Sequence, residues 1–208
     1  MLNKQETSAG DILPLVSLLG FTALRIDLRR KRQHYTRVDN FVNKYIKMTL
    51  QWGTLAVMAY RFEQQLLAIR PTLLGQLLHP IGALMAALLR IFTDIYINPR
   101  AVIQEGLIIH NFAGIDLDPK SAGQNLTVNQ NVCIGEDFSA SGRPVIGNNV
   151  FVGAGAKILG AVTIGNDVVI AANALVTKSI PDCCSVVGVP AQIVSRGVTS
   201  DYLSFNTD

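Results

Sequence analysis

Residues 146–181 read IGNNVF VGAGAK ILGAVT IGNDVV IAANAL VTKSIP, which is a run of six consecutive hexads. An aliphatic residue begins each hexad, and a second small or branched apolar residue stands at its fifth position. A period of six belongs neither to an amphipathic helix nor to an alternating strand. It is typical of stacked short strands, in which each hexad makes one strand and one turn and three hexads close one triangular coil. The stretch therefore predicts a parallel β-helix.

The same period extends upstream of this stretch. Before residue 121, aliphatic residues recur every six positions at Ile97, Ile103, Ile109 and Ile115. After a slip of one residue around 121–123, the period resumes at Val128 and Ile134. Twelve residues then separate Ile134 from Ile146, so the polar segment EDFSASGRP at 136–144 is expected to form a loop. We expect the β-helix to occupy residues 96–194.

Residues 11–92 have a different pattern. Leu, Ala, Met and Gln are common, and apolar residues recur three and four apart, which predicts helices. The fold class is therefore predicted as α+β, with a helical domain at 1–95, the β-helix at 96–194 and a C-terminal tail at 195–208. The basic cluster at 29–32 is interpreted as a solvated helix face, with binding of an acidic membrane or partner as the alternative.

Composition limits the possible classes of function. The 208 residues are 49% apolar and 16% charged, which allows a packed core and excludes a chain disordered throughout. A net charge of +3 gives no support for a nucleic-acid partner. Residues 1–96 contain 12 Lys/Arg and 6 Asp/Glu, whereas residues 97–208 contain 6 and 9. The three cysteines are an odd set with one adjacent pair, which favours a reduced, cytoplasmic chain.

The most apolar run extends from Leu73 to Phe92. It is interrupted by Gln76, Pro80 and Arg90, among others, and its continuous part is short for crossing a bilayer. We interpret it as a buried helix. A helix lying on a membrane surface is the alternative.

Three stretches resemble a known family: VFVGAGAKILGAVTIGNDVVIAANALV at 150–176, VVGVPAQIV at 186–194 and AYRF at 59–62. They are similar to the hexapeptide-repeat acyltransferases, and within these to the serine acetyltransferases and their saccharide-modifying relatives. The resemblance covers roughly residues 42–195. It implies a left-handed β-helix, a homotrimer, and acetyl-CoA bound in a groove between neighbouring coils. Some members pair two trimers through the helical domain.

The reaction that the resemblance implies is O-acetyl transfer. A histidine takes the proton of the acceptor hydroxyl, which attacks the thioester of acetyl-CoA directly, and no metal is needed. Imidazole suits this role because its ordinary pKa lies near the working pH.

The sequence contains three histidines, His34, His79 and His110. His110 lies in GLIIHNFAGI, the segment that holds the catalytic histidine in the family. The family histidine, however, stands two residues after the buried aliphatic position, which is Asn111 here. Three hypotheses stay open: His110 is the base after a small adjustment of the corner, Asn111 marks a weak or inactive subunit kept as a scaffold, or another group supplies the base.

The residues that bind the acceptor also depart from the family. Tyr96 occupies the position of the aspartate that orients the histidine, and Asp94 lies two residues away. Arg143 replaces the histidine of an Arg-His-Pro motif, and its cationic side chain suits a carboxylate or phosphate. The acceptor is therefore predicted to be either L-serine or a saccharide hydroxyl.

The coenzyme side is closer to the family. Gly153, Ala154 and Ala172 match positions that contact coenzyme A, and small side chains there would let the pantetheine arm approach the backbone. Packing of the coils alone is the alternative explanation for them. Lys178 is the first candidate to contact the coenzyme phosphates.

Overall fold

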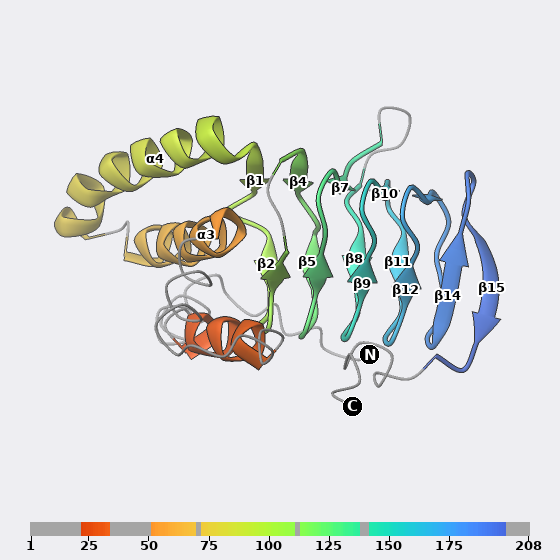
Figure 1. The fold of residues 1–208 in the computed structure, drawn as a ribbon. Helices are drawn as coiled ribbons and strands as arrows, with labels where there is room; N and C mark the ends of the chain where they lie inside the picture. The colour runs from red at the N-terminus through yellow and green to blue at the C-terminus, as the bar shows by residue number, and fades with distance from the viewer. Residues whose placement is uncertain (1–21, 34–50, 70–71, 111–112, 138–141, 199–208) are drawn as a thin grey trace, which may run out of the picture.

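The computed structural model describes residues 22–33, 51–69, 72–110, 113–137 and 142–198. Residues 22–33 are helical, and two further helices follow, α3 (Trp52–Ile69) and α4 (Leu73–Thr93). Figure 1 shows the helices gathered at one end of a long stack of strands. The predicted architecture, a helical region followed by a parallel β-helix of hexapeptide repeats, is confirmed.

Helix α4 leads directly into the β-helix. It begins after Thr72, whose Oγ1 accepts the amide hydrogen of Gly75 at 3.0 Å. It ends at Asp94, which has a left-handed φ of 52° and donates its N–H to the carbonyl of Arg90 at 2.8 Å. The first strand begins at Ile95, next to the predicted boundary between residues 95 and 96.

Fifteen short strands in the described residues form three sheets, which the chain visits in turn. The first sheet contains β1 (Ile95–Ile97), β4 (Ile115–Leu117), β7 (Cys133–Gly135), β10 (Lys157–Leu159) and β13 (Leu175–Val176). The second contains β2 (Val102–Ile103), β5 (Ser121–Ala122), β8 (Val145–Ile146) and β11 (Thr163–Ile164). The third contains β3 (Ile108–Ile109), β6 (Thr127–Val128), β9 (Phe151–Val152), β12 (Val169–Ile170), β14 (Cys184–Val187) and β15 (Gln192–Arg196).

All of these neighbours pair in parallel except β15, which runs antiparallel to β14 and ends the stack. The predicted start of the tail, residue 195, lies inside β15.

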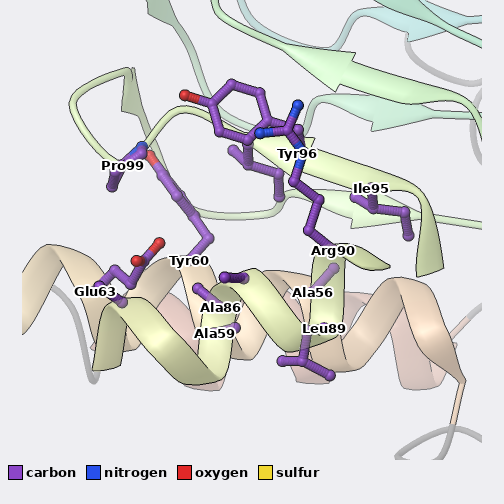
Figure 2. A pocket seen from close by; sticks show the side chains of 13 residues that line it. Ala56, Ala59, Tyr60, Glu63, Ala86, Leu89, Arg90, Ile95, Tyr96 and Pro99 are labelled. Carbon is purple, nitrogen blue, oxygen red and sulfur yellow. The ribbon is translucent and has the colours of Figure 1, made fainter. Parts of the chain in front are cut away.

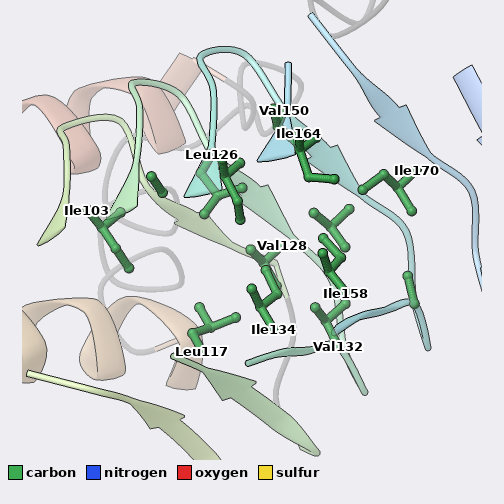
Figure 3. Close-up of a cluster of buried hydrophobic side chains, with 14 of the residues drawn as sticks. Ile103, Leu117, Leu126, Val128, Val132, Ile134, Val150, Ile158, Ile164 and Ile170 are labelled. Carbon is green, nitrogen blue, oxygen red and sulfur yellow. The ribbon is translucent and has the colours of Figure 1, made fainter. Parts of the chain in front are cut away.

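The hexad positions form the core, as predicted. The leading residues are all buried: Ile146, Val152, Ile158, Ile164, Ile170 and Val176. The fifth-position residues are buried as well: Val150, Ala156, Val162, Val168, Ala174 and Ile180. Figure 3 shows Val150, Ile158, Ile164 and Ile170 pointing into the interior of the coils, beside upstream core residues such as Val128 and Ile134. Because each coil repeats the same inward positions, the side chains stack into continuous columns.

The register upstream differs from the prediction. Ile95 pairs with Ile115 and Ile97 with Leu117, so Leu117 and not Ile115 continues the series that includes Ile97. The corner between Ile109 and Ile115 therefore has five residues, whereas the corners at 129–131, 153–155 and 171–173 have three. The prediction was wrong because a spacing of six does not reveal two residues added at one corner.

Buried polar side chains close the open end of the β-helix. Within the described part of the chain no coil precedes the first one, so its outward backbone groups need other partners. Asp27 accepts the N–H groups of Gly106 at 2.6 Å and Leu107 at 2.8 Å. Arg61 donates to Asp27 at 2.9 Å, to the carbonyl of Ile103 at 2.7 Å and to that of Gln104 at 2.8 Å.

The basic cluster at 29–32 takes part in this closure, which corrects the prediction of a solvated face. Arg29 and Arg32 are exposed, but Arg30 is half-buried and Lys31 is only 3% exposed. The Nζ atom of Lys31 donates to the carbonyl of Ile109 at 2.8 Å. The prediction was wrong because these two cations satisfy backbone carbonyls of another element, which the local sequence does not reveal.

The prediction of a buried helix at 73–92 is also wrong. Only 11% of the window Gly75–Thr93 is buried, and among the described residues α4 alone is long and apolar enough to cross a membrane. The helix packs on α3 through small residues such as Gly82, where a Cβ atom would overlap the side chain of Leu66. This narrow contact leaves most of its apolar surface uncovered.

Candidate active site

His110 lies at a corner where the chain passes from the third sheet to the first. Strands β3, β6, β9 and β12 pair in register, so the residues that follow them form one column: His110, Asn129, Gly153 and Ala171. The amide hydrogen of His110 binds the carbonyl of the next coil at 3.1 Å, and that of Gly153 does the same at 2.8 Å. Coils stack about 4.8 Å apart, which places Gly153 about 10 Å from His110 along the column.

Three of the four predicted coenzyme residues lie in this column of corners. Gly153 is buried, Ala154 is half-buried and Ala172 is exposed. A Cβ atom at Gly153 would lie 2.5 Å from the amide nitrogen of Ala172, so glycine is needed for the coils to stack. Lys178 is not in this column. It is exposed and follows β13, at the corner between the first and second sheets.

The enlarged corner that contains His110 is held by the end of α4. Asp94 Oδ2 accepts the N–H of Gly114 at 2.8 Å, and the carbonyl of Thr93 accepts that of Ala113 at 3.0 Å. The structure thus places Asp94 against the backbone of this corner. Asn111 lies outside the described residues.

Tyr96 lies in the middle of β1 and points away from the core, since Ile95 and Ile97 are buried. The guanidinium carbon of Arg90 is 4.3 Å from the centre of its ring, and Figure 2 shows this stacking. Asp116 pairs with Tyr96 in register on the outer face of the first sheet. Burial raises the pKa of the Asp116 carboxyl and is the largest influence on that pKa.

Arg143 lies before β8, at the corner between the first and second sheets, whereas His110 lies at the corner between the third and first sheets. Its Nη1 is 2.6 Å from Oδ1 of Asp118, and Asn98 donates to the same oxygen at 2.7 Å. The two charged side chains are about one-third exposed, at 32% and 30%. The positive charge of Arg143 is therefore matched by a carboxylate of the same chain.

A cavity of about 270 Å³ opens beside Tyr96, between α3, α4 and β1. Alanines supply much of its lining, at positions 56, 59, 83, 86 and 87, and Figure 2 shows Glu63, Arg90 and Tyr96 around them. Burial raises the pKa of the Glu63 carboxyl. The cavity is therefore mostly apolar, with Tyr60, Glu63, Arg90 and Tyr96 as its polar lining residues.

The sequence reasoning missed Asp116, Asp118 and Arg90. The alternation in Ile-Asp-Leu-Asp at 115–118 is a signal that could have found both aspartates, because it turns them to the same outer face. Arg90 reaches Tyr96 from a helix, and no local pattern reveals that contact. Among the described residues, no group of three or more His, Cys, Asp or Glu side chains is arranged to hold a metal ion.

Residues 143–178 match the family model described as bacterial transferase hexapeptide (six repeats). A comparison with curated protein sequences finds no match. Among solved structures, the serine acetyltransferase of Brucella abortus strain S19 is similar, with a TM-score of 0.68 and 25% identity over 91% of this chain and 74% of that one. The soybean serine acetyltransferase complexed with serine gives 0.68 and 26% over 85% and 70%.

The serine acetyltransferase of Neisseria gonorrhoeae in complex with serine has a TM-score of 0.68 and 24% identity, over 87% of this chain and 71% of that one. In all three comparisons the matched part of this chain is longer than the β-helix alone. The similarity therefore includes helices as well as coils. The predicted resemblance to the serine acetyltransferases is confirmed.

Proposed function

We propose that this chain, an acyltransferase similar to the serine acetyltransferases, transfers the acetyl group of acetyl-CoA to a hydroxyl of a small acceptor, with His110 as general base. The observation that carries the proposal is the column of corners in which His110 is followed by Asn129 and then by the small residues Gly153 and Ala171. A base and a run of small side chains along one edge are what direct transfer from a long thioester needs.

The reaction is a single displacement at the thioester carbonyl. A ring nitrogen of His110 takes the proton from the acceptor hydroxyl as its oxygen bonds to the carbonyl carbon. The carbon–sulfur bond then breaks, and the coenzyme A thiolate leaves and receives the proton from the imidazolium. Atoms and charge balance without a further reactant.

Acetyl-CoA would lie along the same column. Gly153, Ala154 and Ala172 leave room for the pantetheine arm to approach the backbone. Lys178 lies at another corner of the coil, so it would meet the phosphates only from a second copy of the chain. The homotrimer that the family resemblance implies would supply that second copy.

A saccharide hydroxyl fits the outer face of the first sheet better than L-serine does. The charge of Arg143 is already paired with Asp118, and Asp116 adds a second carboxylate nearby. The carboxylate of L-serine would meet an arginine that is already paired, whereas its ammonium and the hydroxyls of a sugar can both donate hydrogen bonds to these carboxylates, so the preference for a saccharide rests on the paired Arg143. We therefore propose a saccharide as the acceptor, with L-serine as the alternative.

The test measures thiol release from acetyl-CoA with L-serine, with a panel of saccharides and with no acceptor. We expect release that depends on a saccharide, lower by about 100-fold or more in His110→Ala and His110→Gln. His79→Ala is the matched control, because His79 lies on α4 and should leave the rate unchanged.

Two outcomes would contradict the proposal. Unchanged release in both His110 variants would mean that another group supplies the base. Absence of acceptor-dependent release together with absence of coenzyme A binding would favour the alternative of an inactive scaffold subunit.

A further inference from the structure

Helix α4 presents a broad apolar face to solvent. Its eight most exposed large apolar side chains are between 42% and 85% exposed: Leu73, Leu77, Ile81, Leu84, Met85, Leu88, Ile91 and Phe92. We call these eight residues the α4 face. At 1.5 Å per residue, a helix of 21 residues is about 31 Å long. Figure 1 shows α4 running along one side of the helical end.

The α4 face covers about one-third of the helix circumference, since successive residues turn by about 100°. The buried residues Gly75, Gly82 and Thr93 lie on the opposite side, where Gly82 meets Leu66 of α3. Arg90 is the only charged residue of the helix, and its guanidinium lies over Tyr96, off the α4 face. A face this large on a soluble chain indicates an interaction surface.

The α4 face is wider than the seam that joins two helices in a coiled coil, although its central residues have the spacing of such a seam. Leu77, Ile81, Leu84, Leu88 and Ile91 recur at alternating spacings of four and three, as in a coiled coil. The positions that flank such a seam usually carry charged residues that select the partner. Here the flanking positions hold Leu73, Leu78, Pro80, Met85, Ala87 and Phe92. A wide face without charges suits a lipid surface better than a single partner helix.

The connections of α4 to its neighbours suit a helix that lies along a surface and not one that crosses a bilayer. Thr72 begins α4 three residues after α3 ends, and Asp94 connects it at once to β1. Helix α3 is fixed to the β-helix by Arg61, which is 4% exposed and paired with Asp27. Insertion of α4 across a bilayer would tear these contacts, whereas docking sideways on the surface leaves them intact.

An apolar groove extends this surface. It has a volume of about 310 Å³ and lies between helical segment 22–33, α3 and α4. Leu24, Met58, Phe62 and Met85 are among its lining residues, and Met85 also belongs to the α4 face. A groove of this kind can accept part of a lipid acyl chain.

The charge of the helical half complements anionic lipid. Residues 1–96 hold 12 Lys/Arg and 6 Asp/Glu. Some of these cations are buried or half-buried, but Arg25, Arg29 and Arg32 are exposed on helical segment 22–33, which lines the same groove as α4. Basic residues near a membrane surface add attraction to anionic headgroups. We propose that the α4 face docks this protein on the surface of an anionic membrane, with α4 parallel to the bilayer. This proposal does not depend on the acetyl transfer proposed above.

The experiment is flotation of the full chain with vesicles of phosphatidylcholine, with and without phosphatidylglycerol. The variant Ile81→Glu with Leu88→Glu places two charges in the α4 face. Val102→Glu with Val194→Glu is the matched control, because these side chains are 63% and 60% exposed but lie on the β-helix. We expect the wild type and the control to float with the anionic vesicles. The α4 variant should bind these vesicles at least about tenfold more weakly than the wild type. Added salt should reduce binding.

Two outcomes would overturn the proposal. The first is that the wild type does not float with anionic vesicles; if light scattering then shows the α4 variant with half the mass of the wild type, a second copy is the occupant of the face. The second is that the α4 variant floats as well as the wild type while keeping its circular dichroism spectrum.

Discussion

Replacing Arg61 with methionine should loosen the junction between the helices and the first coil. Methionine keeps an apolar stem of similar length, so the change removes the guanidinium without opening a large cavity. Besides a long contact with Oε1 of Gln64 at 3.4 Å, the guanidinium serves three acceptors, the Asp27 carboxylate and the carbonyls of Ile103 and Gln104. All three would lose a donor in a place where water does not reach, because the Arg61 and Asp27 side chains are only 4% and 2% exposed.

The size of the effect follows from the buried charge. Removing one partner of a buried ion pair leaves the other charge uncompensated and costs about 3–5 kcal/mol. Asp27 keeps the N–H groups of Gly106 and Leu107, so part of its charge remains solvated by the backbone. We therefore expect Arg61→Met to lower the free energy of unfolding by about 3 kcal/mol, at the lower end of that range.

Urea unfolding followed by far-ultraviolet circular dichroism at one protein concentration measures this change. Arg25→Met is the control, because Arg25 is exposed on helical segment 22–33 and should change stability by less than about 0.5 kcal/mol. Adding Asp27→Asn to Arg61→Met removes the buried charge and should recover part of the loss. A loss below about 1 kcal/mol, or no recovery in the double variant, would refute the reasoning.

Two further changes test the stacking and the electrostatics of the coils. Gly153→Ala should lower the free energy of unfolding in urea by about 1–3 kcal/mol, because its Cβ atom would meet the backbone of Ala172. Gly135→Ala is the control and should be nearly neutral, because the nearest atom to its Cβ would be 4.0 Å away. Equal losses in the two variants would contradict this reasoning. Burial lowers the pKa of Lys31 from 10.5 to about 8. The unfolded chain therefore binds the extra proton between these two values, so stability should rise with pH across this window, by up to about 3 kcal/mol relative to Lys31→Met. A difference between the two proteins that does not change with pH would show that Lys31 is not buried as a cation.

The repeat of six was sufficient to predict the coils. Every leading and fifth-position residue from Ile146 to Ile180 is buried, because each must fill the same place inside a triangular coil. The enlarged corner after Ile109 was not predicted. Two residues are added there, and one is lost between Leu117 and Ala122, so the spacing seen in the sequence changes by only one.

The surroundings of the helices were less predictable. In the sequence, Lys31 looks like part of a solvated basic cluster. In the structure, its Nζ atom donates to the carbonyl of Ile109 in the first coil of the β-helix, and this contact buries it. The apolar run that forms α4 indicates that something should cover it, and hydrophobicity alone does not say whether that is the core or another surface.

The candidate site was predictable where it depends on the repeat. Gly153, Ala154 and Ala172 occupy corners whose positions follow from the hexads. The pairing of Arg143 with Asp118 was not predicted, because it joins residues on two different coils. The stacking of Arg90 on Tyr96 depends in the same way on the packing of α4 against β1.

The most direct test of His110 as general base compares coenzyme A binding and acetyl transfer in one variant. For His110→Ala, calorimetry gives the affinity for coenzyme A and thiol release gives the rate with acceptor. Because the base acts on the acceptor hydroxyl, we expect the affinity to change by less than about twofold and the rate to fall by about 100-fold or more. An unchanged rate would contradict the account, as would a loss of affinity large enough to explain the loss of rate.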